Sequence, residues 1–144
     1  MPYRRMLLLA AALMAGHVHA ATPNMQDGLW EITMKMEMAG MPPGMKPQVM
    51  RQCITRKDLE DPRKTTPGGD PTGNRCQITN HKVQGNTASW DMACKGEGAM
   101  TGSGTVTYSG TSYQGTNRMT MKQGGQTQTM TMHYAGKRIG DCKK

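Results

Sequence analysis

The side chains best suited to chemistry in this sequence are methionine thioethers that recur at every second residue. In a β-strand, residues i and i+2 share a face and lie about 6.6 Å apart, which is two rises of about 3.3 Å. Two flexible methionines could therefore converge on one soft ion, and thioether sulfur suits Cu(I) or Ag(I). The candidate soft-metal ligands are Met34, Met36, Met38, Met119, Met121, Met130 and Met132.

Methionine also fills irregular cores, and this chain has 16 Met but no Phe. For the strand methionines, packing in the core is therefore the favoured interpretation. Met41 and Met45 differ, because the Pro- and Gly-rich segment 40–47 cannot continue a strand and buries little. Exposed loop methionines fit either a soft-metal site or an adaptable hydrophobic contact surface.

The histidines and carboxylates form no pattern typical of an active site. After the first twenty residues only His81 and His133 remain, and neither lies in a nucleophile, metalloprotease or phosphate-binding motif. The acidic residues Asp58, Glu60 and Asp61 are balanced by neighbouring Arg and Lys, as in a solvated segment. We expect a protein that is not an enzyme.

The first twenty residues indicate the compartment. Arg4 and Arg5 form a short positive region, and residues 6–15 are an apolar run too short to span a bilayer. Residues 18–20 (Val-His-Ala) then offer small side chains at the −3 and −1 positions of a cleavage site. We expect a signal peptide cleaved after residue 20, with residues 21–144 forming a single disulfide-stabilised β-domain that is periplasmic or secreted.

Charge and composition exclude some classes of partner. The chain has 18 Lys and Arg against 10 Asp and Glu, and its positive charge is spread rather than clustered. Aromatic residues are too few for base stacking and no nucleic-acid motif occurs, so we expect no nucleic-acid partner. We also expect no transmembrane segment after cleavage, and the sequence specifies no oligomeric state.

The four cysteines predict two disulfides, because in an exported domain of this size cysteines usually pair. Their spacings of 23, 18 and 48 residues match no zinc pattern. Three pairings are possible. If Gly85 centres a three-residue hairpin loop, residues whose numbers sum to 170 face each other, which favours Cys76 with Cys94 and leaves Cys53 with Cys142.

The elements that position these side chains are mainly strands, because apolar and polar residues alternate. Residues 29–38 form a half-buried antiparallel strand with the even positions, including Trp30, on the apolar face. A second strand is expected at about 48–54. Thr55 and Asp58 then form a capping box that opens a short helix. This helix stops at Pro62, and residues 63–75 form an exposed loop.

Hairpins follow. A Gly110-Thr111 turn would place Tyr108 opposite Tyr113, and a Gly124-Gly125 turn would place Met119 opposite Met130. Frequent glycines in these strands indicate bulges and bends. We therefore predict an all-β fold, a curved antiparallel β-meander that forms a small or half-open barrel, with about seven strands and one short helix.

An ordered set of motifs resembles an exported proteobacterial family, the domain-of-unknown-function family 3617. The motifs are Gly28-Leu29-Trp30-Glu31, the G-M-P-x-G-M loop at 40–45, Gln52-Cys53-Ile54-Thr55, Cys76, Trp90-x-Met92-x-Cys94, Gly98-x-Met100-x-Gly102 and Gly140-Asp141-Cys142. One departure is Arg56, where proline is more usual. The resemblance implies a small, β-rich envelope protein with a signal peptide, and it transfers no activity.

The sequence thus predicts a non-enzymatic binding or interaction module without a cofactor. Its partner would be an apolar ligand or an envelope protein. The alternative is a soft-metal protein that binds Cu(I) or Ag(I) through the methionine pairs. The residues expected to face the ligand or partner are Trp30, Met34, Met36, Met38, Met41 and Met45.

Overall fold

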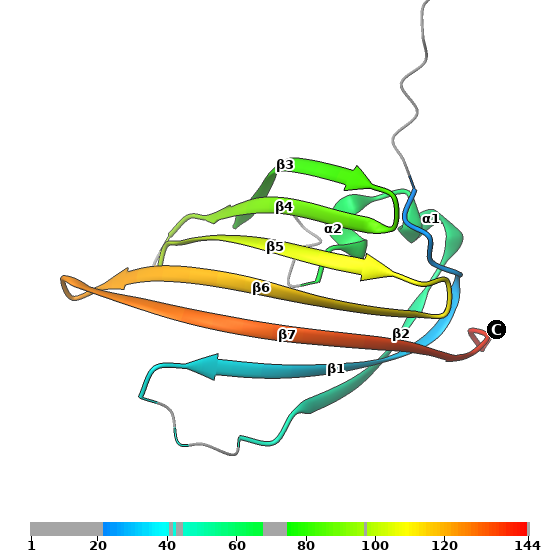
Figure 1. The fold of residues 1–144 in the computed structure, drawn as a ribbon, viewed down its shortest axis with the longest axis horizontal. Coiled ribbons are helices and arrows are strands. Elements are labelled where there is room, and N and C mark those ends of the chain that lie inside the picture. Colours follow the sequence, from blue (N-terminus) through cyan, green and yellow to red (C-terminus); the bar gives the residue numbers. More distant parts are fainter. Residues whose placement is uncertain (1–21, 41, 43–44, 68–74, 97, 144) are drawn as a thin grey trace, which may run out of the picture.

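The computed structural model describes residues 22–40, 42, 45–67, 75–96 and 98–143. Within them, seven strands form one antiparallel sheet in the order β2-β1-β7-β6-β5-β4-β3 (Figure 1). The strands are β1 (Gly28–Met38), β2 (Gln48–Ile54), β3 (Cys76–Gln84), β4 (Thr87–Cys94), β5 (Met100–Tyr108), β6 (Ser112–Gln123) and β7 (Gln126–Gly140). The expected signal peptide and Met41 lie outside the described residues.

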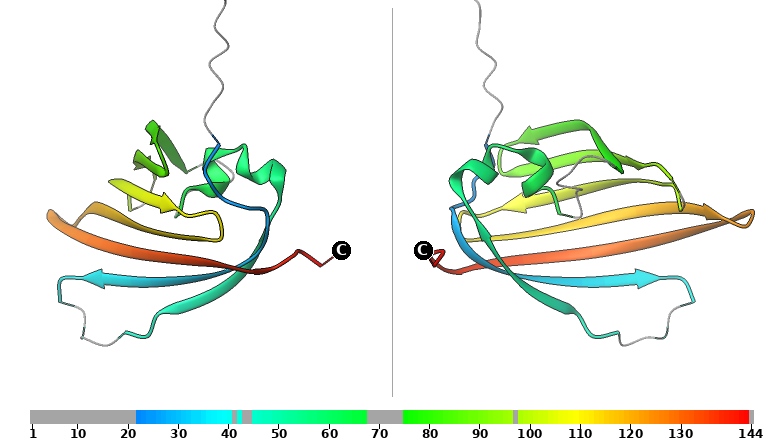
Figure 2. Two further views of the ribbon diagram at one scale, coloured as in Figure 1. Left: turned by 45° about the vertical axis from the view of Figure 1, so that its right-hand side comes forward. Right: turned by 180° about the vertical axis from the view of Figure 1, so that it is seen from behind.

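The predicted curved meander is confirmed for β3 to β7, which pair in sequence order. The β1–β2 hairpin then attaches to the end of the meander, because β1 pairs with β7. Figure 2 shows the sheet curled into an open half-barrel, with β2 and β3 as its two free edges.

Two short helices follow β2, where one was expected. The predicted capping box is present, since the Thr55 N–H donates to Asp58 Oδ2 at 2.9 Å and the Asp58 N–H donates to Thr55 Oγ1 at 3.2 Å. The helix that this box opens ends at Leu59, before Pro62, as predicted, but the expectation of a loop from residue 63 is wrong, because Pro62 begins a second helix. Proline suits the first position of a helix, where its missing N–H needs no partner, and Asp61 caps this turn by accepting from the Arg63 N–H at 3.0 Å. The helices are α1 (Arg56–Leu59) and α2 (Pro62–Thr65).

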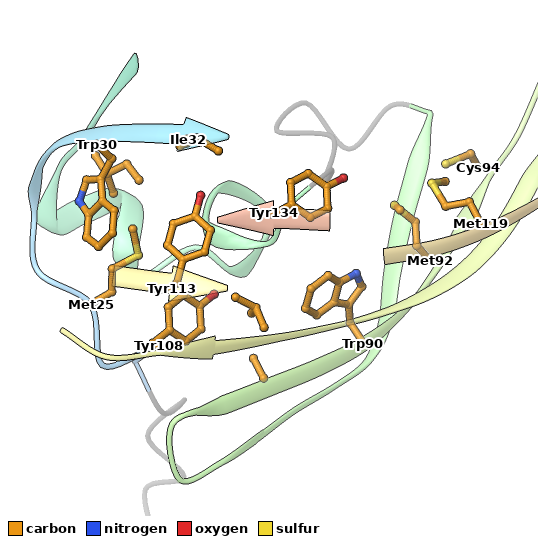
Figure 3. Packing of buried hydrophobic residues seen from close by; sticks show 13 residues of the cluster. Met25, Trp30, Ile32, Trp90, Met92, Cys94, Tyr108, Tyr113, Met119 and Tyr134 are labelled. Carbon is orange, nitrogen blue, oxygen red and sulfur yellow. The ribbon is translucent and has the colours of Figure 1, made fainter. Parts of the chain in front are cut away.

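The core lies on the concave face of the sheet, beneath the two helices (Figures 2 and 3). Alternation along each strand brings one set of side chains to this face, and the Tyr108 hydroxyl joins it to α2 by donating to the Thr65 carbonyl at 3.3 Å. The buried apolar cluster comprises Met25, Trp30, Ile32, Ile54, Ala88, Trp90, Met92, Cys94, Val106, Tyr108, Tyr113, Met119 and Tyr134. The opposite, convex face carries the polar positions.

The β3–β4 hairpin has the predicted cysteine register, but its loop length differs from the predicted one and a bulge compensates for the difference. Its loop has two residues, Gly85 and Asn86, so pairs near the turn sum to 171 rather than 170. The register shifts by one between Thr79 and Lys82. Asn80 lies there with a φ of 52°, a conformation that asparagine tolerates better than most residues. This bulge restores the sum of 170, so that Cys76 faces Cys94.

The other predicted registers are confirmed. Tyr108 pairs with Tyr113, and Met119 pairs with Met130. Both predicted disulfides are also present, Cys76–Cys94 and Cys53–Cys142. The first joins neighbouring strands, whereas the second ties the edge strand β2 to the residues that follow β7.

Candidate binding face of the sheet

The strand methionines predicted from the sequence lie together on the concave face. We call this set, with Met100 added, the methionine face: Met34, Met36, Met38, Met100, Met119, Met121, Met130 and Met132. Four pairs are direct cross-strand neighbours, namely Met36 with Met132, Met38 with Met130, Met119 with Met130, and Met100 with Met121. The face spans four strands, of which β5, β6 and β7 are consecutive in the sequence and β1 is distant from them.

Cross-strand pairing brings the thioethers closer than spacing along one strand does. Directly opposite residues have Cβ atoms about 4.5–5.5 Å apart, compared with about 6.6 Å between residues i and i+2. Met36, Met38, Met130 and Met132 therefore form a compact block of four. Met34 lies at one side of this block, opposite Tyr134.

Burial divides the methionines into two groups. Met119 is 6% exposed and belongs to the core, as the packing interpretation expects. The other seven are only partly buried, and Met36 is 36% exposed. Four of these seven, Met34, Met100, Met130 and Met132, still pack against the buried core, so core filling accounts for part of the methionine face but leaves its exposed surface unexplained.

Trp30 lies beneath the accessible surface. It is fully buried, its Nε1–H donates to the Gln26 carbonyl at 3.0 Å, and its ring centroid lies 5.5 Å from that of Tyr113. Met45, before β2, is 48% exposed, as expected for the loop. Trp30 can thus support the face but not contact a ligand directly.

A cavity of about 140 Å³ opens beside the methionine face, between β1, β2 and α2. Its apolar lining includes Ile32, Met34, Met50, Tyr113 and Tyr134. Arg63 and Lys64 also line it, each in an ion pair within the helical segment, with Asp61 at 2.9 Å and with Asp58 at 2.6 Å. The lining is therefore more apolar than polar, and its two cations already have partners.

The buried tyrosines of this region stay neutral. Burial raises the pKa of the Tyr113 hydroxyl to about 12, and it does the same for Tyr134. At neutral pH, the concave face therefore presents phenol groups and not phenolates.

The convex face carries the arrangement closest to a catalytic one. His133 Nδ1 lies 3.4 Å from Thr116 Oγ1, and His133 Nε2 lies 3.4 Å from Glu37 Oε2. A hydrogen bond from Lys35 is the main cause that lowers the pKa of Glu37. Both distances exceed those of a working nucleophile–base pair, and the His133 and Glu37 side chains are about half exposed. This geometry resembles the ordinary cross-strand contacts of a polar sheet face.

Sequence reasoning missed two residues of the concave face, Asn117 and Trp90. Asn117 is fully buried and Trp90 is 3% exposed, yet their side-chain polar atoms have no hydrogen-bond partner. A signal was present, because Asn117 occupies an inward position between Tyr113 and Met119 in the alternation of β6. A polar residue at such a position points to a buried amide.

Comparisons complete this description. In the described part of the chain, none of the helices could cross a bilayer, and no three His, Cys, Asp or Glu side chains gather as a metal-binding group. A family profile described as a protein of unknown function matches residues 25–142. No curated protein and no solved structure matches the chain.

Proposed function

The chain belongs to the DUF3617 family of proteins of unknown function, and from this premise we propose that it is a non-enzymatic binding protein that holds a small apolar ligand on its methionine face. The observation that carries the proposal is the partial exposure of seven clustered methionines on a concave surface. Contiguous exposed apolar surface of this kind typically marks an interaction site.

Methionine suits such a face because it adapts to its ligand. Its unbranched, polarizable side chain can repack around different shapes, as at promiscuous binding surfaces. The 140 Å³ cavity next to Met34 supplies an enclosed apolar space for part of a ligand. A small molecule with an apolar body therefore fits better than a flat protein surface, which would need a larger exposed area.

We further propose that the protein works in the periplasm. The pattern of residues 1–20 supports export, and two disulfides are typical of oxidising compartments. An apolar ligand would there be carried between or away from envelope surfaces.

The test uses N-phenyl-1-naphthylamine, an uncharged fluorescent probe. Met36→Lys is expected to weaken its binding at least tenfold, because the charge lies at the centre of the apolar block. Met36 is already 36% exposed, so the fold should tolerate lysine there. The control is Val49→Lys, at an apolar residue that is more accessible, at 60% exposed, and points to the convex face.

The control variant should bind the probe within twofold of the unmodified protein. Equal weakening by both variants would show that net charge, and not the methionine face, governs binding. If the unmodified protein does not bind the probe, the proposed function is contradicted.

Soft-metal binding is the second candidate function. The observation that favours it is the compact block of Met36, Met38, Met130 and Met132, whose thioethers suit Cu(I) or Ag(I) as cargo. Leucine at these four positions preserves apolar area and abolishes thioether ligation. Such a variant should keep probe binding if the ligand is apolar, and it should lose competition with a Cu(I) chelator if the cargo is a metal.

A further inference from the structure

Among the described residues, three polar side chains of the concave face are buried without a hydrogen-bond partner of good geometry. They are Trp90 through Nε1, Asn117 through both amide atoms, and Tyr134 through its hydroxyl. Their exposed fractions are 3%, 0% and 4%. Buried polar groups in native proteins are almost always paired, because an unpaired one has lost its water without compensation. Three unpaired side chains on one face therefore need an explanation.

The three side chains are neighbours. Trp90 and Asn117 pair with Gly104 from opposite sides, so only one strand separates them. A Cβ at Gly104 would lie 2.6 Å from Trp90 Cε2, the carbon bonded to Nε1, so the indole lies over this strand. The absence of a side chain at Gly104 thus leaves room for the ring beside Asn117.

Tyr134 completes the cluster from β7. A weak side-chain hydrogen bond with Asn117 lowers the pKa of the Tyr134 hydroxyl against the larger rise that burial causes, although this contact falls outside strict hydrogen-bond geometry. Figure 3 shows Tyr134 and Trp90 on the same face, with Met92 and Met119 beyond them.

We propose that Trp90, Asn117 and Tyr134 form a polar subsite for an uncharged oxygen acceptor, such as a ketone or ester carbonyl, on an otherwise apolar ligand. This inference rests on the proposed function and specifies the class of ligand. The indole offers an N–H and no acceptor, whereas the amide and the phenol each offer donors as well as an acceptor oxygen, so a ligand oxygen can accept from all three side chains. None of the three carries a charge, and a carboxylate there would lose its hydration without a counter-charge.

The subsite can be reached from the methionine face. Met132 lies directly opposite Asn117, and Met34 lies directly opposite Tyr134. Both methionines are partly exposed, and their flexible side chains can move aside. Tyr134 also lines the 140 Å³ cavity, a volume close to that of engineered cavities of about 150 Å³ that bind benzene. A benzene-sized ring there would lie against Tyr134, the member of the subsite that lines the cavity, and a substituent would have to extend past this ring to reach Asn117.

The test compares two probes of nearly equal shape. Acetophenone carries a carbonyl where α-methylstyrene carries a methylene group. Their dissociation constants are measured by displacement of N-phenyl-1-naphthylamine from the unmodified protein and from Asn117→Leu and Tyr134→Phe. The quantity of interest is the change in the ratio of the two constants between the unmodified protein and each variant, because this comparison cancels the difference in hydrophobicity between the probes.

We expect the preference for acetophenone to fall at least tenfold in Asn117→Leu and several-fold in Tyr134→Phe. α-Methylstyrene should bind the variants as well as the unmodified protein, because only polar atoms are removed. Tyr134→Phe keeps the aromatic ring and removes only the hydroxyl. It therefore still tests the subsite if Asn117→Leu does not fold.

An unchanged ratio would overturn the subsite while leaving the proposed function in place, since both probes would still bind. A cluster that merely holds an internal water would also leave the ratio unchanged, and Asn117→Leu would lower the urea midpoint. Failure of both probes and of the naphthylamine to bind the unmodified protein would overturn the proposed function together with the subsite.

Discussion

The double substitution Cys53→Ser and Cys142→Ser removes one disulfide, and we expect it to lower the free energy of unfolding by about 4–5 kcal/mol. The two cysteines are 89 residues apart, and a cross-link over so long a loop removes much entropy from the unfolded chain. Cys53 lies on β2, an edge strand that pairs only with β1. The disulfide is therefore a second attachment for this edge, which borders the cavity.

The matched control is the pair Cys76→Ser and Cys94→Ser. It opens a loop of only 18 residues between strands that already form a hairpin, so about 3 kcal/mol is expected. Urea unfolding followed by circular dichroism measures both losses. A larger loss from the Cys76–Cys94 pair than from the Cys53–Cys142 pair would contradict the role given to the long cross-link.

Trp30→Ala is expected to cost about 3–5 kcal/mol of unfolding free energy, the range for removing a large buried aromatic. Trp30 is fully buried against Tyr113, and its indole N–H holds the Gln26 carbonyl at 3.0 Å. Alanine would leave a cavity in the core and leave the segment before β1 without this anchor.

Thr33→Ala on the convex side of the same strand is the control, with an expected change within 0.5 kcal/mol. The same unfolding measurement applies. A loss below 1 kcal/mol for Trp30→Ala would mean that the concave face tolerates a large hole, and that the aromatic cluster does not support the methionine face.

The strands and hairpins could be predicted because each depends on local signals. Alternation fixes which face each residue occupies, and the two-residue turns at Gly110 and Gly124 fix the pairing on either side. The Cys76–Cys94 pair was predicted correctly, but through a loop of the wrong length. The bulge at Asn80 compensates, since Asn80 adopts a positive φ and donates to Asp91 at 2.7 Å.

Long-range contacts were beyond this kind of reasoning. Nothing local to residues 28–38 shows that β1 pairs with β7, about a hundred residues later, and this pairing brings Met36 and Met38 against Met132 and Met130. Spacing along one strand therefore could not show that the methionines of β1 and β7 adjoin one another. The second helical turn was missed because Pro62 was taken only as a stop and not as a first helical residue.

The polar subsite also depends on long-range strand pairing, which the sequence alone does not reveal. Asn117 stood out only as a polar residue in an apolar series, and its nearness to Trp90 depends on the register of three strands and on Gly104. Such a cluster exists only once the sheet is assembled.

The most direct measurement follows the methionine ε-methyl groups by NMR in protein labelled there with ¹³C. Titration with N-phenyl-1-naphthylamine should shift the resonances of Met34, Met36, Met130 and Met132 and leave that of Met45, in the loop, in place. This result would show that the methionine face holds the ligand. Saturable binding that shifts Met45 while leaving the four face residues unmoved would contradict the account.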